Sequence, residues 1–268
     1  MKLSISNIAW DNDELESYLQ IIKDMGCDGI EIAPSCIWDE PSHASDEQIS
    51  KIIKTIKKYD LEVSSFRSLL YTKPNINIFN KEKRNETISY LKKIIEIAAS
   101  FGTKTMIFGS PKNRQINLNN YDDEYNTSIE LFKIMADKCK KYDICFCIEP
   151  LGTSCNNFIQ TSTDGRKLVE AVDSPNFGLH LDASAITEMK EDLTKIFKNN
   201  IKILKHFHIN DLKLNLLGTT SVDHVSISKA ISNSGYNNFL SIEMKKHDNI
   251  KKSIIDSIKY AREVYFEK

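Results

Sequence analysis

The sequence is poor in several features that would place it in a fibrous, disordered or membrane class. It has only nine glycines and six prolines among 268 residues, too few for a collagen-like or low-complexity chain. No apolar run approaches the length of a membrane-spanning helix, so we expect no transmembrane segment. The 36 Lys and Arg residues almost balance the 37 Asp and Glu residues, so no net basic field attracts nucleic acid or a membrane surface. These absences indicate a globular protein with neither partner.

The cysteines lack the spacing of a disulfide framework or of a zinc knuckle. No pair forms a Cys-x-x-Cys motif, and no secretory leader pattern precedes the body of the chain. We therefore expect reduced thiols in a cytoplasmic protein, most of them packed as small core residues. The six cysteines are Cys27, Cys36, Cys139, Cys145, Cys147 and Cys155.

Glycine-rich nucleotide-binding turns are also missing, which bears on the choice between two α/β folds. Apolar runs typical of buried strands alternate with segments of helical periodicity, at a spacing of about 30 residues and without a linker-like change in composition. Eight such units predict a closed (β/α)8 TIM barrel, a single domain over residues 1–268. The alternative is a doubly wound open sheet, which the absence of a Gly-x-Gly-x-x-Gly turn disfavours. The expected strands are 1–10, 29–34, 61–70, 103–109, 144–150, 177–181, 203–209 and 239–244, and the expected helices are 11–25, 45–59, 81–101, 121–142, 163–172, 191–199, 226–232 and 250–265.

Four of the expected strands end on a side chain that can bind a metal ion. The run Ile-Cys-Phe-Cys-Ile-Glu-Pro at 144–150 ends with Glu149, a carboxylate that is costly to bury without a partner. The next three strands end on Asp182, His208 and Glu243. Because all strand C-termini open on one face of such a barrel, we expect these four side chains to converge there. Residues two apart share a strand face, so the layer beneath them is Cys147, His180, His206 and Ser241.

Three carboxylates in one place repel one another unless one is protonated or a cation lies among them. Two glutamates, one aspartate and one histidine offer mostly hard oxygen ligands. This set suits Mn²⁺, with Mg²⁺ and Co²⁺ as alternatives, and suits structural zinc poorly because no thiolate is placed with it. The competing interpretation is four unrelated buried polar groups satisfied by salt bridges.

Further candidate residues lie at the ends of the first and the third strand and in the loop after the fourth. We interpret Arg67, Lys112 and Arg114 as groups that hold a phosphate or carboxylate of a substrate, with solvated loop charges as the alternative. Trp10 is interpreted as a wall of the pocket, with plain core packing as the alternative.

Three residues are expected to support the metal ligands from below. By strand parity Glu31 points into the barrel, where it can orient His206 or Arg67. The competing interpretation of Glu31 is a paired core carboxylate. His180 and His206 belong to the layer beneath the four ligands and complete this supporting set.

At these residues the chain resembles the xylose isomerase-like TIM barrels, and among them the sugar isomerase/epimerase branch that includes D-tagatose 3-epimerase and the allulose epimerases. The resemblance covers nearly the whole chain. It is carried by Glu149-Pro150, His180-Leu181-Asp182, His208-x-x-Asp211, and Ile242-Glu243 after Gly235-Tyr236.

The resemblance implies that Glu149, Asp182, His208 and Glu243 hold one divalent ion. It also implies that Glu149 and Glu243 move protons on opposite sides of a substrate carbon. A metal that polarises a carbonyl and its neighbouring hydroxyl acidifies the C–H bond between them, and loss of that proton gives a metal-bound cis-enediolate. Proton return from the opposite face inverts the carbon, whereas return at the adjacent carbon interconverts aldose and ketose.

Three positions depart from the free-ketohexose epimerases, in which a His, a Glu and an Arg usually hold substrate hydroxyls. Here these positions are Ala185, Cys155 and Leu214. The departures concern the identity of the sugar and leave the metal ligands intact. The trinuclear-zinc apurinic endonucleases share the fold but need further His ligands after strands three and four, where this chain has none.

The sequence therefore favours a metal-dependent sugar or sugar-phosphate isomerase/epimerase that works on a small molecule. A dehydratase or carbon–carbon lyase of an inosose or keto acid is the second hypothesis, and a noncatalytic sugar-binding barrel is the third. The resemblance also implies a homodimer, since barrel helices in this family commonly pair.

Overall fold

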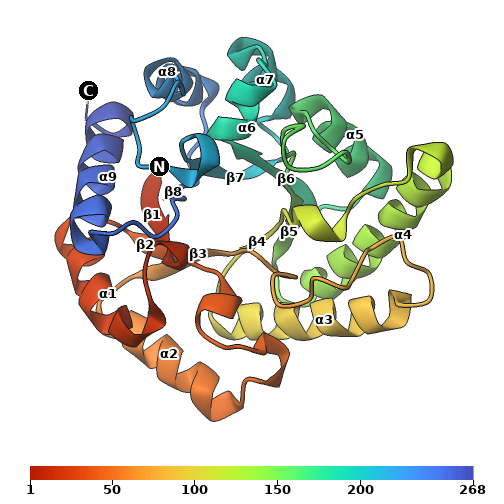
Figure 1. The fold of residues 1–268 in the computed structure, drawn as a ribbon, viewed down its shortest axis with the longest axis horizontal. Coiled ribbons are helices and arrows are strands. Elements are labelled where there is room, and N and C mark those ends of the chain that lie inside the picture. The colour runs from red at the N-terminus through yellow and green to blue at the C-terminus, as the bar shows by residue number, and fades with distance from the viewer. Residues whose placement is uncertain (268) are drawn as a thin grey trace.

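Eight parallel strands close into one barrel in a computed structural model that describes residues 1–267 (Figure 1). Each strand pairs with its neighbours in the chain, and β8 pairs with β1. This topology confirms the predicted (β/α)8 barrel. The strands are β1 (Lys2–Ser6), β2 (Gly29–Ile32), β3 (Glu62–Phe66), β4 (Thr105–Phe108), β5 (Cys145–Ile148), β6 (Phe177–Asp182), β7 (Leu204–Ile209) and β8 (Phe239–Ile242).

The helices form a ring outside the strands (Figure 1). They are α1 (Leu15–Asp24), α2 (Asp46–Lys58), α3 (Arg84–Ser100), α4 (Tyr121–Lys140), α5 (Ser162–Val172), α6 (Ala183–Glu188), α7 (Leu193–Asn200), α8 (His224–Ser234) and α9 (Ile250–Tyr265). No helix within residues 1–267 is both long and apolar enough to cross a membrane.

Local sequence signals explain several helix ends. The Ser45 hydroxyl accepts a hydrogen bond from the Gln48 backbone N–H, and the Gln48 side-chain oxygen accepts one from the Ser45 backbone N–H, so a capping box starts α2. Gly102 has φ +75° just after α3, the left-handed conformation in which glycine costs least. Helix α6 was not expected. It starts immediately after β6, where the carboxylate of Asp182 accepts the Ala185 amide at 2.7 Å.

Two strands, the first and the third, end four residues earlier than expected. The first strand was expected to continue to residue 10, but it ends at Ser6 and a 3-10 turn follows. The Asn7 side chain bonds both backbone groups of Ala33, at 2.7 and 3.3 Å, which diverts the chain towards the end of β2. The third strand was expected to continue to residue 70 and ends at Phe66. These shorter strands leave longer loops at the rim of the barrel.

Two β-bulges set which side chains point into the barrel. Between β2 and β3, Ile30 pairs with Val63 but Glu31 pairs with Ser65, so Ser64 is an extra residue. Between β6 and β7, Leu179 pairs with Leu204 but His180 pairs with His206, so Lys205 is an extra residue. A bulge redirects the side chains around it. Here the two bulges align Glu31, His206 and His208 on the inner face.

Candidate metal and active site

The four side chains expected to bind a metal meet at the C-terminal ends of β5 to β8. Glu149, Asp182, His208 and Glu243 each offer one donor atom, and all these atoms lie within 4.8 Å of one another. Nδ1 of His208 is 3.1 Å from Oε2 of Glu243, 3.5 Å from Oε1 of Glu149 and 4.0 Å from Oδ2 of Asp182. We call these four residues the quartet. Its convergence matches the geometry expected from strand parity.

The quartet has the properties of a cation site. All four side chains are buried, and Nδ1 of His208 makes no hydrogen bond although three carboxylates surround it. Burial, together with the charges of Glu243 and Glu149, raises the pKa of Asp182 to about 7. Such crowding is relieved by a dication, and three carboxylates with one imidazole are ligands that suit Mn²⁺, Mg²⁺ or Co²⁺. The residues present therefore fit a divalent metal ion.

Glu31 holds the other side of the His208 ring. Its Oε2 lies 2.9 Å from Nε2 of His208 and 3.2 Å from Nε2 of His206, and it also accepts a hydrogen bond from Ser65. The two imidazoles hold the pKa of Glu31 well below its usual range, against the opposing effect of burial. A carboxylate that accepts a hydrogen bond from one ring nitrogen fixes the imidazole so that the other nitrogen can bind a metal ion. The expected contact between Glu31 and His206 is present. The sequence did not predict the contact between Glu31 and His208.

His180 lies against the quartet from the layer below. Its Nε2 is 3.4 Å from Oε1 of Glu149, and its ring centre is 4.0 Å from that of His208. Burial and the neighbouring His208 lower the pKa of His180 to about 4. A neutral ring there packs beside the ligands without adding positive charge. Its position agrees with the expected layer.

Arg67 reaches the quartet from the end of β3. Its Nη2 pairs with Oε1 of Glu243, and its Nε lies 3.8 Å from Oε1 of Glu31. The side chain is 14% exposed, so it is not a solvated loop charge. The partners that the structure gives Arg67 are the carboxylates of the site itself. A substrate contact for Arg67 stays a prediction.

Lys112 and Arg114, both in the loop after β4, occupy different environments. Lys112 is exposed, as the solvated-charge interpretation requires. Arg114 is completely buried and donates from Nη2 to the backbone carbonyl of Glu149 at 2.7 Å. Burial lowers its pKa to about 10, and its Nε and Nη1 have no hydrogen-bond partner within residues 1–267. Arg114 thus supports the strand end that bears Glu149.

Trp10 packs as a core side chain. It is 4% exposed, and its ring stacks on Tyr18 with 5.4 Å between ring centres. Trp10 therefore has core packing contacts, and its role as a wall of the pocket stays a prediction.

Two residues that our sequence reasoning missed complete the site. Asn210 donates to Oδ2 of Asp182 and, at 3.1 Å, to Oε2 of Glu243. It lies two residues beyond His208, so strand parity carried one step further points to it. Gly109 lies against the carboxylate of Glu149, since a Cβ built on Gly109 is 2.1 Å from Oε2 of Glu149. Only a residue without a side chain fits beside that carboxylate.

Comparisons with known proteins agree with this architecture. A family model described as xylose isomerase-like TIM barrel matches residues 19–264. A probable ketose 3-epimerase of Synechocystis sp. (strain ATCC 27184 / PCC 6803 / Kazusa) is 25% identical, over 91% of this chain and 84% of that protein. A ketose 3-epimerase of Arthrobacter globiformis is 26% identical, over 38% of this chain and 35% of that protein.

Solved structures show the same fold. The D-psicose 3-epimerase of Clostridium cellulolyticum H10, determined with D-tagatose, superposes with a TM-score of 0.85 at 17% identity, covering 99% of both chains. The 3-keto-D-glucoside 4-epimerase of E. coli superposes with a TM-score of 0.81 at 18% identity, covering 98% of this chain and 99% of that one. Because the family model spans most of the sequence, the resemblance inferred from the strand-end motifs is confirmed: the chain belongs to the xylose isomerase-like TIM barrel family.

Proposed function

We propose that this protein is a divalent-metal-dependent sugar or sugar-phosphate isomerase/epimerase. The observation that supports it most is the quartet itself, with four donor atoms within 4.8 Å of one another at the C-terminal ends of adjacent strands. Active sites of TIM-barrel enzymes lie at that face. The ketose 3-epimerases among the relatives make a sugar the substrate class to test first.

Glu149, Asp182, His208 and Glu243 would hold the cation, with Mn²⁺ the best match to the donor set. When bound, such a cation polarises a carbonyl and an adjacent hydroxyl and so acidifies the C–H bond between them. Glu31 and Asn210 keep the ligands in place. Glu31 fixes the His208 ring, and Asn210 ties Asp182 to Glu243.

Glu149 and Glu243 are the proposed acid/base pair. They directly follow β5 and β8, the two outer strands of the four that carry the quartet, so they lie on different sides of it. Different neighbours hold them, because Gly109 and His180 lie beside Glu149 whereas Arg67 pairs with Glu243. Two carboxylates in unlike environments can serve as base and acid in one proton transfer. One takes the proton that leaves the substrate carbon, and the other returns a proton from the opposite face.

The chain departs from the pattern of the free-ketohexose epimerases at three positions. Ala185 and Leu214 carry no polar side-chain group, and Cys155 carries a thiol on an exposed loop. The chain therefore lacks the His, Glu and Arg that usually hold the sugar hydroxyls in those enzymes. This difference favours a sugar or sugar phosphate other than a free ketohexose.

Solvent exchange tests the proposal. The full chain with Mn²⁺ is incubated in deuterated water with a panel of ketoses and ketose phosphates, and deuterium at carbon is followed by NMR. Exchange together with an isomeric product of otherwise unchanged mass supports the proposal, whereas loss of water or of a fragment identifies a dehydratase or lyase. Metal binding without exchange on any substrate identifies a noncatalytic barrel. Glu243→Gln abolishes the exchange, and the exposed-site control Glu170→Gln retains it.

A further inference from the structure

The loop between β5 and α5, residues 149–161, is gathered around one carboxylate of α6. Glu188 is the last residue of α6, and its Oε1 accepts hydrogen bonds from the backbone N–H of Ser154 at 2.7 Å and from the hydroxyl of Thr153 at 3.0 Å. Its Oε2 accepts a third bond, from the hydroxyl of Ser154 at 2.7 Å. Against the effect of burial, these hydrogen bonds lower the pKa of Glu188. The carboxylate is therefore ionised at neutral pH, and the three bonds are charge-assisted.

The sequence of the loop tip, residues 152–155, fits this contact. A Cβ built on Gly152 is 2.4 Å from Oε2 of Glu188, so only a residue without a side chain lets the carboxylate approach. Two residues with hydroxyl groups, Thr153 and Ser154, follow directly. Thr153, Ser154 and Cys155 are exposed, so buried packing does not hold them in place. The conformation of the tip therefore depends on hydrogen bonds, and Glu188 accepts three of them.

The loop after β4 binds the same segment. The side-chain amide of Gln115 donates to the backbone carbonyl of Cys155 at 3.3 Å. The Asn157 side chain bonds both backbone groups of Ile116, accepting from its N–H at 2.9 Å and donating to its carbonyl at 2.8 Å. Strands β4 and β6 flank β5 in the barrel. The tip is thus fixed between the segments that follow its two neighbouring strands.

The fixed tip lies at the same end of the barrel as the quartet. Its loop leaves β5 at Glu149, and α6 begins directly after Asp182, whose carboxylate accepts the first-turn amide of Ala185. Burial, together with the charges of Glu188, Asp182 and Glu149, raises the pKa of the Cys155 thiol. The tip therefore lies near two members of the quartet, and Glu188 holds it there.

We propose that Glu188 is a positioning residue that fixes residues 152–157 as one wall of the substrate pocket, beside Glu149. This role rests on the proposed function, because a sugar at the barrel mouth is what the wall contacts. Within the part of the chain that the structure describes, the carboxylate of Glu188 bonds the loop alone, so it acts through the loop and not on the reacting atoms. A wall that is already in place lowers the entropy cost of binding. Its release therefore weakens substrate binding more than it slows proton transfer.

Steady-state kinetics of the full chain with Mn²⁺ test this role, with D-tagatose and D-ribulose 5-phosphate as probes and the faster of the two used throughout. Glu188→Ala removes all three hydrogen bonds, so we expect KM to rise about tenfold or more while kcat stays within about twofold. Mn²⁺ affinity, measured by calorimetry, is unchanged. Glu188→Gln keeps an acceptor oxygen for two of the donors, and its amide can donate to the Ser154 hydroxyl. This conservative variant therefore restores most of the wild-type KM.

Hydrogen–deuterium exchange of the backbone, followed by mass spectrometry, measures the loop without any substrate. Residues 151–160 are expected to exchange about tenfold faster in Glu188→Ala than in wild type, and at the wild-type rate in Glu188→Gln. Thr153→Val/Ser154→Ala removes two donors from the other side of the contact and leaves only the backbone donor. It therefore gives a smaller increase in the same direction.

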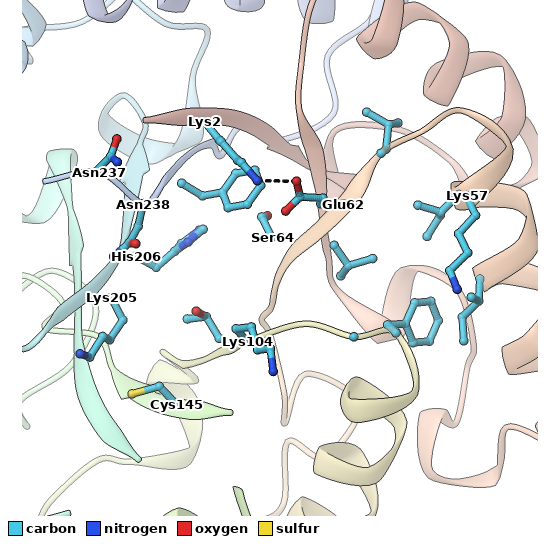
Figure 2. A pocket seen from close by; sticks show the side chains of 18 residues that line it. Lys2, Lys57, Glu62, Ser64, Lys104, Cys145, Lys205, His206, Asn237 and Asn238 are labelled. Carbon is cyan, nitrogen blue, oxygen red and sulfur yellow. Dashed lines mark hydrogen bonds and ion pairs between the residues drawn. The ribbon is translucent and has the colours of Figure 1, made fainter. Parts of the chain in front are cut away.

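Glu62→Ala is the matched control. The carboxylate of Glu62 also has a partner, the ammonium of Lys2, but this pair lies at the opposite end of the barrel, at the first residues of β3 and β1 (Figure 2). The variant therefore keeps the wild-type KM and the wild-type exchange rate of the loop.

Unchanged exchange of residues 151–160 in Glu188→Ala overturns the proposal. A fall in kcat or in Mn²⁺ affinity with KM unchanged also overturns it, because Glu188 would then act on the metal site. If wild type turns over neither probe nor any other ketose, the proposed function fails. The exchange rate of the loop in Glu188→Ala and Glu188→Gln still decides whether Glu188 positions it.

Discussion

Arg67 and Glu243 form an ion pair at the mouth of the barrel, and this pair distinguishes Glu243 from Glu149. The guanidinium engages Oε1 of Glu243, while Oε2 faces Nδ1 of His208 at 3.1 Å. Within residues 1–267 no guanidinium pairs with the carboxylate of Glu149, and Arg114 bonds its backbone carbonyl instead. Arg67 also lowers the pKa of Glu243 against the effect of burial. Against the effect of burial, His180 and His208 hold the pKa of Glu149 well below its usual range, so the two proposed proton-transfer groups are stabilised as carboxylates by different residues.

Replacing Arg67 is expected to separate metal binding from proton transfer. In Arg67→Met the carboxylate of Glu243 loses its partner, so we expect a fall of about tenfold to a hundredfold in the rate of deuterium exchange. Mn²⁺ affinity is retained or increased, because a positive charge beside the cation has been removed. Arg67→Lys restores part of the exchange rate. Calorimetry measures Mn²⁺ affinity, and the exchange assay measures proton transfer. A parallel loss of Mn²⁺ affinity and exchange rate would contradict a role of Arg67 in proton transfer alone.

Glu31 is expected to govern metal affinity through His208. Glu31→Gln removes the carboxylate that bonds Nε2 of His208. The imidazole ring therefore loses its fixed orientation. Loss of such a partner typically costs about 10- to 100-fold in metal affinity. Mn²⁺ titration by calorimetry checks this, with the melting temperature recorded to confirm folding. Glu62→Gln, an exposed carboxylate at the other end of the barrel, serves as the matched control and keeps wild-type affinity.

Strand parity was sufficient to predict the quartet, because it depends only on the alternation of side chains and on where apolar runs stop. Glu149, Asp182, His208 and Glu243 each follow such a run, and in a closed parallel barrel those ends must meet. The same reasoning placed His180 in the layer beneath. These features are local in sequence and repeat from strand to strand.

Strand parity predicted the contact between Glu31 and His206, but other contacts between distant strands were beyond the sequence. The pairing of Glu31 with His208 depends on two register shifts, and a bulge leaves no mark in the composition of β3 or β7. The pairing of Arg67 with Glu243 joins β3 to β8 across the barrel mouth. Helix α6 is only six residues long, too short for a periodic pattern to reveal it.

Gly109→Ala tests whether space beside Glu149 is required for the site. The new methyl group would lie 2.1 Å from Oε2 of Glu149, so the carboxylate must move. We expect loss of Mn²⁺ binding and of exchange, with a decrease of about 1–3 kcal/mol in the free energy of unfolding from the overpacked contact. Gly102→Ala is the contrasting control. It has open space around it but φ +75°, so it lowers stability by about 1 kcal/mol and leaves exchange unchanged.

Carboxylates are crowded around Asp182, so we expect the free energy of unfolding of the metal-free protein to fall as the pH rises. Burial and the neighbouring carboxylates raise the pKa of Asp182 from the ordinary value of 3.8 to about 7 in the folded state, so between these pH values the folded state holds a proton that the unfolded state releases. The protonated carboxyl therefore favours folding fully below about pH 4, and this contribution is lost as the pH rises to about 7.

Urea unfolding in the presence of EDTA measures the free energy of unfolding of wild type and of Asp182→Asn as a function of pH. Asparagine is isosteric with the protonated acid and keeps the N-cap of α6, so the variant should not show the loss. Relative to the variant, wild type is expected to lose about 2–4 kcal/mol of unfolding free energy between pH 4 and pH 8. Mn²⁺ added at pH 8 stabilises wild type more than Asp182→Asn, because the variant lacks one ligand. If the difference between the two proteins stays constant from pH 4 to pH 8, the carboxylates are not crowded as the structure has them.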